Sequence, residues 1–521
     1  MTGARRLDWR FLLSLPPGGI DHLILLGGDA ALRGLAVELG MARRVSASLS
    51  EGAPADLVAV LSGARADPHR VAAALRRGGA WYWEVDRPLA LRWGGSGFAP
   101  TADRLARAGL GASTAYWVHG GFTTPRLFMP LDRDAALAWY FSTIFRTHSV
   151  GRRTLRAGLR ILTGWRGPRF ERLVRHYALV GTGGHPPAVL GAVGSNHVGH
   201  DPRPLVLLGG EGEWSRVTLV PFPTPQGTPA VVVKLARRSA FAGRTEHEQQ
   251  VLRELSSRAP WSLGRSIPRP LGFFDWQGLG VGIESRAAGT PLLSDAPGDA
   301  NSAARQLAGA GAWLTDLHMA TERERVGGQA LRDRLVGAPL GQYESVFGHD
   351  SREARLFAYA RRHAERSEGA ELPIVLEHGD FGPWNVFRDG RHITVVDWEA
   401  ARDGPPLCDL LYFLAHWDAQ SHHRGMPQAV RRLAIPLSAP RGDRHAEIAR
   451  REIVWYTRRL GVTETLYPLL VLYTFVEQAL DRVARLREQG DPGAADRAAN
   501  PYVACVGALA GEVERLFPES S

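Results

Sequence analysis

The sequence predicts an α/β domain followed by an α+β domain with two lobes. Three observations support this prediction. The 521 residues exceed what one ordinary hydrophobic core holds together. From about residue 20 to residue 90, apolar strand-like runs alternate with helical patterns, which is typical of a parallel sheet covered by helices. Beyond residue 204 the pattern changes to closely spaced strands and then, from about residue 300, to a mainly helical part.

The change of pattern also gives the domain boundaries. Residues 183–203 are rich in Gly, Pro and His and lack a regular period, so we expect a linker there. The predicted parts are an α/β domain at 1–182, this linker, a β-rich lobe at 204–286 and an α-rich lobe at 287–521.

Composition is that of an ordinary folded, soluble protein, with 44% hydrophobic and 22% charged residues. Cys408 and Cys505 are the only cysteines, which excludes a disulfide framework and fits a reducing compartment. The first residues lack the pattern of a signal peptide, and no apolar run reaches the roughly 18 residues of a membrane span. We therefore expect a cytoplasmic protein.

Positive charge is concentrated in the first part of the chain. Residues 1–200 contain 25 arginines and 13 acidic residues, and eight of these arginines lie within 152–175, where Glu171 is the only acidic residue. A solvated or domain-packing helix is the favoured interpretation of this segment, and peripheral contact with an anionic surface is the alternative. Because arginine supplies nearly all basic residues of the chain, its number alone does not indicate a nucleic-acid partner, and we expect none.

The first domain begins with the pattern of a Rossmann-like sheet. The run "HLILLGG" is a strand that ends in Gly27 and Gly28, a helical pattern follows, and "ADLVAVLSG" is a second buried strand. This arrangement resembles the class I S-adenosylmethionine-dependent methyltransferases. However, the turn lacks G-x-G-x-G, and no carboxylate follows "RRVSASLS" where that family holds the ribose. We therefore expect a degenerate domain, with a working methyltransferase as the alternative.

The β-rich lobe contains the only lysine of the chain. The segment "LVLLGGEGEWSRVTLVPF" reads as a strand, a glycine turn and a second strand, and "TPAVVVKLAR" reads as a third strand that ends near Lys234. A charged helix, "RTEHEQQVLRELSSR", follows. A lysine offers a compact charge on a slim stem, whereas the guanidinium of arginine is a broad planar fork, so this position calls for the shape of lysine.

The most informative segment is "VLEHGDFGPWNVFRDGRHITVVDWEAARDG". His378, Asp380 and Asn385 form H-G-D-x-x-x-x-N, in which an aspartate lies five residues before an asparagine, as in a kinase catalytic loop. Asp397 follows at the end of the buried run "ITVVD", so a short hairpin would bring it near Asn385. Phosphoryl transfer requires a carboxylate that accepts the proton of an attacking hydroxyl and oxygen ligands that hold Mg²⁺ on the phosphates. The segment therefore predicts a phosphotransfer site.

Residues 204–521 resemble the aminoglycoside phosphotransferase and choline kinase-like family, relatives of protein kinases that phosphorylate small molecules. The resemblance implies a bilobal protein-kinase-like fold with ATP and Mg²⁺ as cofactors. It implies that Asp380 is the catalytic base and that Asn385 and Asp397 are the Mg²⁺ ligands. It also implies structural support of the loop by three further residues, namely His378, Glu399 and Asp409.

The same resemblance assigns the nucleotide-binding residues of the β-rich lobe. Lys234 would reach the α- and β-phosphates, paired with a carboxylate of the next helix. Glu248 is the preferred partner, and Glu246 and Glu254 are the alternatives. The glycine turn would cover the phosphates, and the segment "IESRAAG" would be the hinge that reads adenine; the residues concerned are Gly209, Gly210, Gly212, Ser285 and Ala287.

The sequence thus predicts an enzyme that transfers the γ-phosphate of ATP to a hydroxyl of a small molecule. From Asp403 onward, the chain contains 15 acidic residues and 14 arginines, so its charge is nearly balanced. A pocket for polycationic aminoglycosides should instead be acidic. This balance favours a sugar, an amino alcohol or a similar metabolite over an antibiotic. Four aromatic residues could form a stacking wall, although core packing is their favoured interpretation: Trp417, Trp455, Tyr456 and Tyr467. A nucleotide-binding regulator without catalysis and a bifunctional methyltransferase-kinase are the alternatives, and the oligomeric state is left open.

Overall fold

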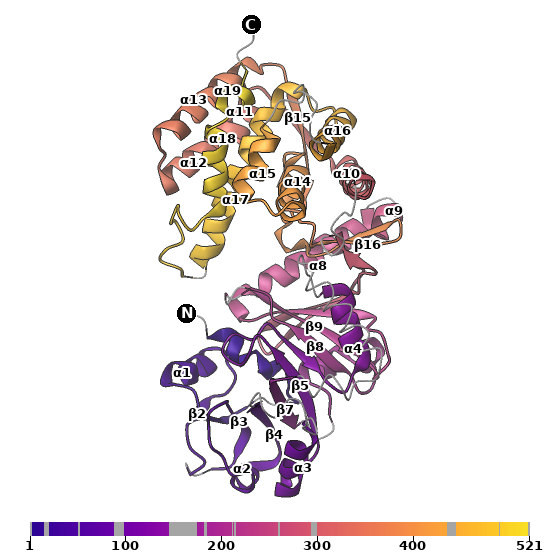
Figure 1. Cartoon of the computed structure of the whole chain (residues 1–521), viewed down its shortest axis with the longest axis vertical. Helices are drawn as coiled ribbons and strands as arrows, with labels where there is room; N and C mark the ends of the chain where they lie inside the picture. Colours follow the sequence, from indigo (N-terminus) through magenta and orange to yellow (C-terminus); the bar gives the residue numbers. More distant parts are fainter. Residues whose placement is uncertain are drawn as a thin grey trace. The chain divides into compact units, whose positions relative to one another are not determined.

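The computed structural model describes residues 3–14, 20–50, 53–87, 98–144, 174–181, 185–210, 212, 215–258, 261–292, 300–434, 444–488 and 490–518. The chain divides into two compact units (Figure 1). Unit 1 comprises Met1–Gln249 and Pro270–Arg286, and unit 2 comprises Gln250–Arg269 and Ala287–Ser521. Within the described ranges, no helix combines the length and the apolar character that crossing a membrane requires.

Unit 1 is built on one mixed sheet of twelve strands in the order β11-β12-β10-β9-β8-β6-β5-β7-β4-β3-β1-β2. The strands β2, β1, β3 and β4 are parallel to one another, and every other pairing in the sheet is antiparallel. The strand bounds are β1 His22–Leu26, β2 Arg44–Ser46, β3 Ala55–Val60, β4 Leu75–Asp86, β5 Ser113–His119, β6 Leu127–Pro130, β7 His176–Gly181, β8 Arg203–Leu207, β9 Arg216–Phe222, β10 Val231–Ala236, β11 Pro270–Trp276 and β12 Leu279–Ser285.

The predicted alternation of strands and helices is present at the start of this sheet, but a separate Rossmann-like domain is not confirmed. Strand β6 pairs with β8, which places Leu127 opposite Leu207, so hydrogen bonding continues from the strands of the first 182 residues into the predicted β-rich lobe. The helical segments of unit 1 are η1 Ala4–Leu12, α1 Ala30–Glu38, α2 Pro68–Ala74, α3 Ala99–Leu105, η3 Ala106–Leu110, α4 Asp134–Trp139, η4 Tyr140–Ile144, α6 Ala188–Val193, α7 Ser195–Val198 and η7 Ser239–Phe241.

Both faces of the sheet are covered, which explains the continuous apolar runs in the sequence. Successive side chains of a strand point to opposite faces, so Leu23 and Leu25 of β1 join one hydrophobic cluster while Ile24 and Leu26 join another. Helix α1 begins after Asp29, whose carboxylate accepts a hydrogen bond from the backbone N–H of Leu32 at 2.8 Å.

A buried carboxylate lies near the end of β4. Glu84 accepts hydrogen bonds from the backbone N–H of Ser62 at 2.6 Å and from the hydroxyl of Tyr82 at 3.2 Å. Burial raises the pKa of Glu84 to about 7. The folded chain therefore holds a proton on this group at pH values where the unfolded chain has lost it.

This carboxylate gives unit 1 a pH-dependent stability. Because the folded pKa of Glu84 is raised above the ordinary value of 4.5, its contribution to the free energy of unfolding is lost as the pH rises through the interval up to about 7. We expect Glu84→Gln to remove up to about 3 kcal/mol of this loss. Urea unfolding of the unmodified protein and of Glu84→Gln at about pH 5 and about pH 8 measures this loss. If the free energy of unfolding changed equally with pH in both proteins, Glu84 would not be the source of the pH dependence.

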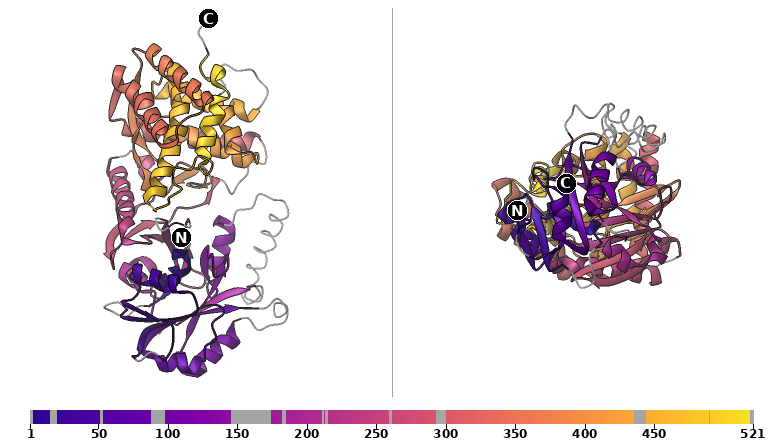
Figure 2. Two further views of the ribbon diagram at one scale, coloured as in Figure 1. Left: turned by 90° about the vertical axis from the view of Figure 1, so that its left-hand side faces the viewer. Right: turned by 90° about the horizontal axis from the view of Figure 1, so that it is seen from below.

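Unit 2 is mainly helical, with two small sheets of three strands, β13-β16-β17 and β14-β15-β18 (Figures 1 and 2). Its strands are β13 Thr290–Pro291, β14 Glu324–Gly327, β15 Glu371–Glu377, β16 Val386–Asp389, β17 His392–Val395 and β18 Arg402–Gly404. Its helical segments are α9 Trp261–Gly264, α10 Ala300–Thr321, α11 Gly328–Arg332, η9 Asp333–Gly337, α12 Ala338–Phe347, α13 Ser351–Arg366, η10 Trp398–Ala400, α14 Cys408–Ser421, α15 Met426–Leu433, α16 Arg444–Arg459, η11 Glu464–Leu466, α17 Tyr467–Glu488, α18 Pro501–Ala510 and α19 Val513–Leu516. Helix α8, Ala242–Arg258, begins in unit 1 and ends in unit 2.

One hydrophobic cluster fills unit 2 and joins α10, α14, α17 and α18. Helix α17 contributes almost every residue from Tyr467 to Val476 to this core, which explains why its apolar run is longer than that of a surface helix. Beyond residue 204, a strand-rich part is therefore followed by a mainly helical part, as predicted from the sequence.

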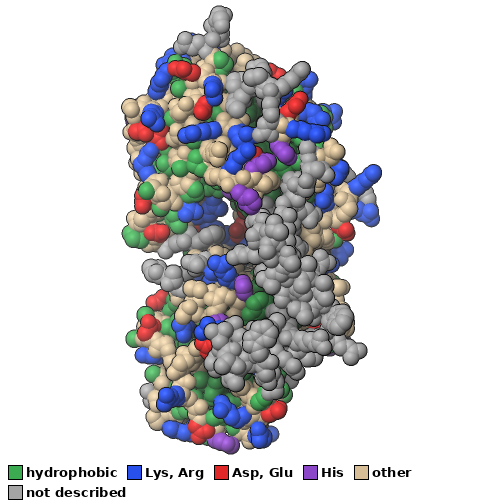
Figure 3. All heavy atoms as spheres, in the orientation of Figure 1, with side chains coloured by type: hydrophobic (Ala, Val, Ile, Leu, Met, Phe, Trp, Pro, Cys, Tyr) green, Lys and Arg blue, Asp and Glu red, His purple; other side chains and the backbone are tan. Residues whose placement is uncertain are grey.

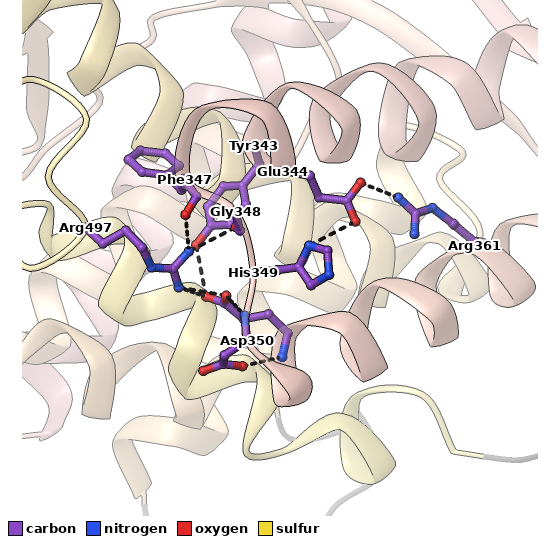
Figure 4. A network of polar contacts seen from close by, with 9 residues as sticks. Tyr343, Glu344, Phe347, Gly348, His349, Asp350, Arg361 and Arg497 are labelled. Carbon is purple, nitrogen blue, oxygen red and sulfur yellow. Dashed lines mark hydrogen bonds and ion pairs between the residues drawn. The ribbon is translucent and has the colours of Figure 1, made fainter.

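The connection between α12 and α13 is fixed by a polar network (Figure 4). Arg497 donates two hydrogen bonds to the carboxylate of Glu353, at 2.7 and 2.8 Å, and two more to the backbone carbonyl oxygens of Phe347 and Gly348. Glu353 is buried and forms a capping box with Asp350 at the start of α13. One arginine thus holds a helix start and the preceding turn together.

Removing this arginine is expected to destabilise unit 2. Arg497→Met leaves the buried Glu353 carboxylate without its cation, which lowers the free energy of unfolding by about 3 kcal/mol. The neighbouring ion pair of Arg361 with Glu344 (2.8 Å) is more exposed and is the matched control, so Arg361→Met should cost less than about 1 kcal/mol. Urea titrations followed by tryptophan fluorescence compare the two, and similar costs would contradict the prediction.

On the face drawn in Figure 3, Arg and Lys side chains are interspersed with Asp and Glu. Residues 152–173 of the predicted arginine-rich segment lie outside the described ranges, so their contact with an anionic surface stays a prediction.

Candidate active site

The predicted catalytic loop starts at the end of a buried strand. Every residue of β15 after Glu371 is buried, and the loop follows directly at His378. The carboxylate of Asp409, at the start of α14, accepts hydrogen bonds from the backbone N–H groups of His378 at 2.6 Å and Gly379 at 3.0 Å. Gly379 has a φ of +77°, and a Cβ there would overlap the carbonyl oxygen of Ala400, so only glycine fits between the histidine and the aspartate.

His378 holds both ends of this loop. Its Nε2 donates to the carbonyl oxygen of Val396 at 3.0 Å, because a carbonyl can only accept. Its Nδ1 then accepts from the backbone N–H of Asp380 at 3.3 Å. The ring therefore joins the loop to the segment before Asp397.

The carboxylate of Asp380 is hydrogen-bonded at both oxygens. The side-chain amide of Asn385 donates to Oδ2 at 3.0 Å and to the backbone carbonyl of Asp380 at 2.9 Å. The hydroxyl of Tyr412, on α14, donates to Oδ1 at 3.0 Å. Burial raises the pKa of Asp380, the charge of His378 opposes this, and the nearby Asp397 raises it further. The arrangement fixes the orientation of a carboxylate that can accept a proton.

Strands β16 and β17 form the hairpin that the sequence predicts between the two metal-ligand candidates. The backbone N–H of Val396 donates to the carbonyl of Asn385 at 3.0 Å, so Asn385 and Asp397 lie at the same end of this hairpin. Asp397 has a φ of +77°, a left-handed conformation that is uncommon for a residue other than glycine. The next residue, Trp398, is buried and donates from its indole N–H to the carbonyl of Val395 at 3.0 Å, which fixes this bend.

The donor set of this hairpin fits Mg²⁺. Asn385 uses its amide nitrogen for Asp380, so its amide oxygen would be the ligand atom if a metal were bound, and Asp397 would supply a carboxylate. Within the described residues, no group of three or more His, Cys, Asp or Glu is placed so that it could hold a metal ion. Mg²⁺ prefers oxygen ligands and keeps several waters, so one amide and one carboxylate suffice.

The supporting carboxylates occupy different positions. Asp409 is buried beneath the loop, and although burial opposes it, hydrogen bonding and charge from His318 together with the charge of His378 lower the pKa of Asp409. Glu399 lies on η10, two residues after Asp397, and is half-buried.

An aromatic cluster beside Asp380 was missed by sequence reasoning. The Tyr412 ring lies 4.4 Å from that of His416 and 6.1 Å from that of Trp384, and its hydroxyl is 3.3 Å from the hydroxyl of Tyr502. Burial lowers the pKa of His416 to about 4, so this ring is neutral. The spacing of Tyr412 and His416 by four residues on one helix is the only signal that the sequence offers. Of the four aromatic residues proposed as a stacking wall, three are buried in the core and Trp455 is exposed.

In unit 1, the predicted ion pair of the β-rich lobe is formed. The Nζ of Lys234 lies 2.7 Å from Oε1 of Glu248 and 2.8 Å from Oε1 of Glu284, and Arg216 binds the second oxygen of Glu248. Of the two alternative partners, Glu246 is exposed and Glu254 lies 3.5 Å from Arg323 in unit 2. The sequence favoured Glu248, and the structure places that residue against the lysine.

Glu284 was not predicted. It lies on β12, two residues after Gly282, which is opposite Lys234, and burial raises the pKa of Glu284 to about 7 although Lys234 opposes this. A glutamate within the apolar run "GVGIES" is the signal that could have revealed it. Lys234 therefore lies between two buried carboxylates.

The remaining predicted nucleotide residues lie at the ends of strands. The glycine turn connects β8 and β9, and the structure describes Gly209, Gly210 and Gly212 in it. Ser285 is the last residue of β12 and pairs with Val231. Ala287 is the first residue of unit 2 after this strand, so the predicted hinge coincides with the point where the chain leaves unit 1.

Residues 223–445 match the phosphotransferase enzyme family. The resemblance drawn from the sequence is confirmed over this segment. The phosphotransferase segment begins directly after β9 and ends within α16, so it contains Lys234, Glu248 and the whole loop from His378 to Asp409, whereas the glycine turn precedes it.

Several solved structures are similar to this chain. A thermostable mutant of aminoglycoside phosphotransferase APH(4)-Ia in its apo form is 16% identical, with 59% of this chain and 94% of that chain covered and a TM-score of 0.38. Macrolide 2'-phosphotransferase MphH from Brachybacterium faecium is 16% identical, with coverage of 64% and 98% and a TM-score of 0.37. ADP-bound APH(2'')-Ib is 14% identical, with coverage of 63% and 98% and a TM-score of 0.35. No curated protein matches the chain.

Proposed function

We propose that the protein is an ATP- and Mg²⁺-dependent phosphotransferase that moves the γ-phosphate to a hydroxyl of a small molecule. The observation that carries the proposal is the hydrogen bond from Asn385 to the carboxylate of Asp380, with Asp397 at the same end of the β16–β17 hairpin as Asn385, within a segment that matches a phosphotransferase family. Asp380 orients the acceptor hydroxyl and takes its proton. Asn385 and Asp397 would hold Mg²⁺, which when bound neutralises charge on the phosphates.

Lys234 is the cation for the nucleotide phosphates in this proposal. Glu248 and Glu284 hold its ammonium group in a fixed place, 2.7 and 2.8 Å from their carboxylate oxygens. Such a fixed charge stabilises the phosphates without reorganisation during the reaction. Arg216 shares Glu248, which balances the second negative charge of this buried cluster.

The aromatic cluster supports an acceptor with an apolar face as well as a hydroxyl. Trp384, Tyr412, His416 and Tyr502 bring their rings together beside the Asp380 carboxylate, and aromatic rings with a polar edge suit such amphipathic molecules. Sugars and amino alcohols satisfy this description, and the acceptors named for similar structures, aminoglycosides and a macrolide, extend the set to be tested.

The deciding experiment is a screen for ATP-dependent phosphorylation. The full-length protein is incubated with ATP and Mg²⁺ and with sugars, amino alcohols, aminoglycosides and a macrolide, and the products are identified by mass spectrometry. We expect ADP formation that depends on one acceptor class, with a mass increase of one phosphate on that acceptor. ATP binding without phosphorylation of any class would favour the non-catalytic regulator instead.

A further inference from the structure

The glycine turn of unit 1 is held by a buried arginine from the end of the lysine strand. Arg237 directly follows β10, three residues after Lys234, and its side chain is fully buried. Its Nη1 donates to the backbone carbonyl oxygens of Gly210 at 3.3 Å and Gly212 at 2.6 Å. Two peptide groups of the turn therefore have their orientation set by one side chain.

This arginine is itself anchored by the N-terminal segment. Its Nε donates to Oδ2 of Asp8 at 2.8 Å, and both side chains are fully buried. Asp8 belongs to η1, 229 residues away in the sequence. The guanidinium can bind a carboxylate and two carbonyl oxygens at once because it is a rigid planar group with five donors, which a lysine does not offer.

The same N-terminal segment binds the turn a second time. Arg5 donates from Nε to the carbonyl of Leu208 at 3.0 Å and also bonds the carbonyl of Gly209. Arg10 donates to the carbonyl of Arg237 at 2.6 Å. The backbone carbonyl groups of residues 208, 209, 210 and 212 thus accept hydrogen bonds from two arginines. Arg5 lies on η1, and Arg237 is anchored to η1 through Asp8.

The anchor is rigid because η1 is packed on both parts of the sheet. Trp9 stacks on Tyr82 of β4, with ring centroids 4.5 Å apart and planes within 11°, and both rings are buried. Phe11 lies 6.4 Å from Trp276 of β11. Residues that precede the phosphotransferase segment by more than 200 positions are therefore fixed against the same twelve-stranded sheet that carries the glycine turn.

We propose that Arg237, anchored by Asp8, is a positioning residue that prepares the glycine turn for the phosphates of a nucleotide. The inference rests on the proposed function, which supplies the nucleotide. A turn of several glycines loses more conformational entropy on ordering than other backbone, so fixing it before the nucleotide arrives removes this cost from binding. The N-terminal segment 3–14 is in this way a component of the nucleotide site.

The test compares two buried arginines of unit 1. Arg237→Lys keeps the charge beside Asp8 but removes the fork that holds the turn. Arg133→Lys is the matched control, because Arg133 is also buried and binds Asp132 at 3.0 Å and Asp201 at 2.8 Å without touching the turn. We expect Arg237→Lys to raise the Kd for a fluorescent ATP analogue and the KM for ATP about tenfold, with kcat nearly unchanged, because the nucleotide must then order the turn itself; tenfold corresponds to about 1.4 kcal/mol.

Hydrogen exchange of the turn separates this inference from the proposed function. Arg237→Lys should accelerate amide exchange in peptides that cover residues 208–216, whereas Arg133→Lys should not, although both variants lower the melting temperature. Unchanged exchange in the turn, or an equal effect of both variants on the Kd, would overturn the positioning role. If the unmodified protein binds no ATP while the exchange result holds, the proposed function fails, the nucleotide role fails with it, and only the holding of the turn remains.

Discussion

Replacing Asp380 with asparagine is expected to lower kcat for phosphotransfer by about a thousandfold. In the proposed function the carboxylate accepts the proton of the acceptor hydroxyl, and an amide cannot do so at neutral pH. Asparagine has the same shape and fits the surrounding bonds. Its oxygen can accept from Asn385, and its NH₂ group can donate to the hydroxyl oxygen of Tyr412, whose proton can turn to Tyr502 at 3.3 Å.

The substitution is informative because the fold should not change. Circular dichroism and the Kd for ATP should match those of the unmodified protein, while the rate of product formation falls. Asp481→Asn is the matched control: it removes a carboxylate of the same unit that lies 2.6 Å from Arg402, and it should leave kcat within about twofold. A kcat for Asp380→Asn close to that of the control would reject Asp380 as the base.

The geometry of the proposed catalytic loop could be predicted from the sequence because its parts are close along the chain. His378, Asp380, Asn385 and Asp397 lie within 20 residues, and a two-stranded hairpin is enough to bring them together. The loop needs a glycine between the histidine and the aspartate for a left-handed backbone, which is a signal that a single sequence contains. Local spacing and turn chemistry therefore carried this part of the prediction.

The aromatic cluster and the second carboxylate could not be predicted in the same way. Tyr412 and Tyr502 are 90 residues apart, and only the packing of α14 against the start of α18 brings their hydroxyls to 3.3 Å. Glu284 lies on a different strand from Lys234, and the pairing register of β10 with β12 places it within reach. Such contacts depend on how helices and strands pack, which hydrophobic periodicity alone does not define.

The sequence pattern also did not predict how many strands the sheet would contain. Alternation predicted strands near residues 22 and 57, and β1 and β3 are there. It did not predict that β6 would pair with β8, because an antiparallel pairing between strands some 80 residues apart has no local signal. The same holds for η1, whose charged residues reach the glycine turn.

The second large effect is expected at the only lysine. Lys234→Arg keeps the positive charge between Glu248 and Glu284, so the protein should still fold. The guanidinium is longer and planar, and Arg216 already binds the second oxygen of Glu248, so the new group cannot reach the same point between the two carboxylates. We expect kcat/KM for ATP to fall about a hundredfold, because the charge no longer meets the phosphates in a fixed place.

A second substitution separates shape from charge. Lys234→Met leaves two carboxylates buried without the ammonium group that joins them, which should lower the free energy of unfolding by about 3 kcal/mol. For Lys234→Arg, the free energy of unfolding should instead stay within about 1 kcal/mol of that of the unmodified protein, while the activity falls. Steady-state kinetics and urea unfolding of both variants measure this, and a Lys234→Arg variant that uses ATP as well as the unmodified protein would show that the position requires only a positive charge. In a chain with 62 arginines, that result would make the lysine a matter of composition, whereas the expected loss of activity ties it to the geometry of phosphate binding.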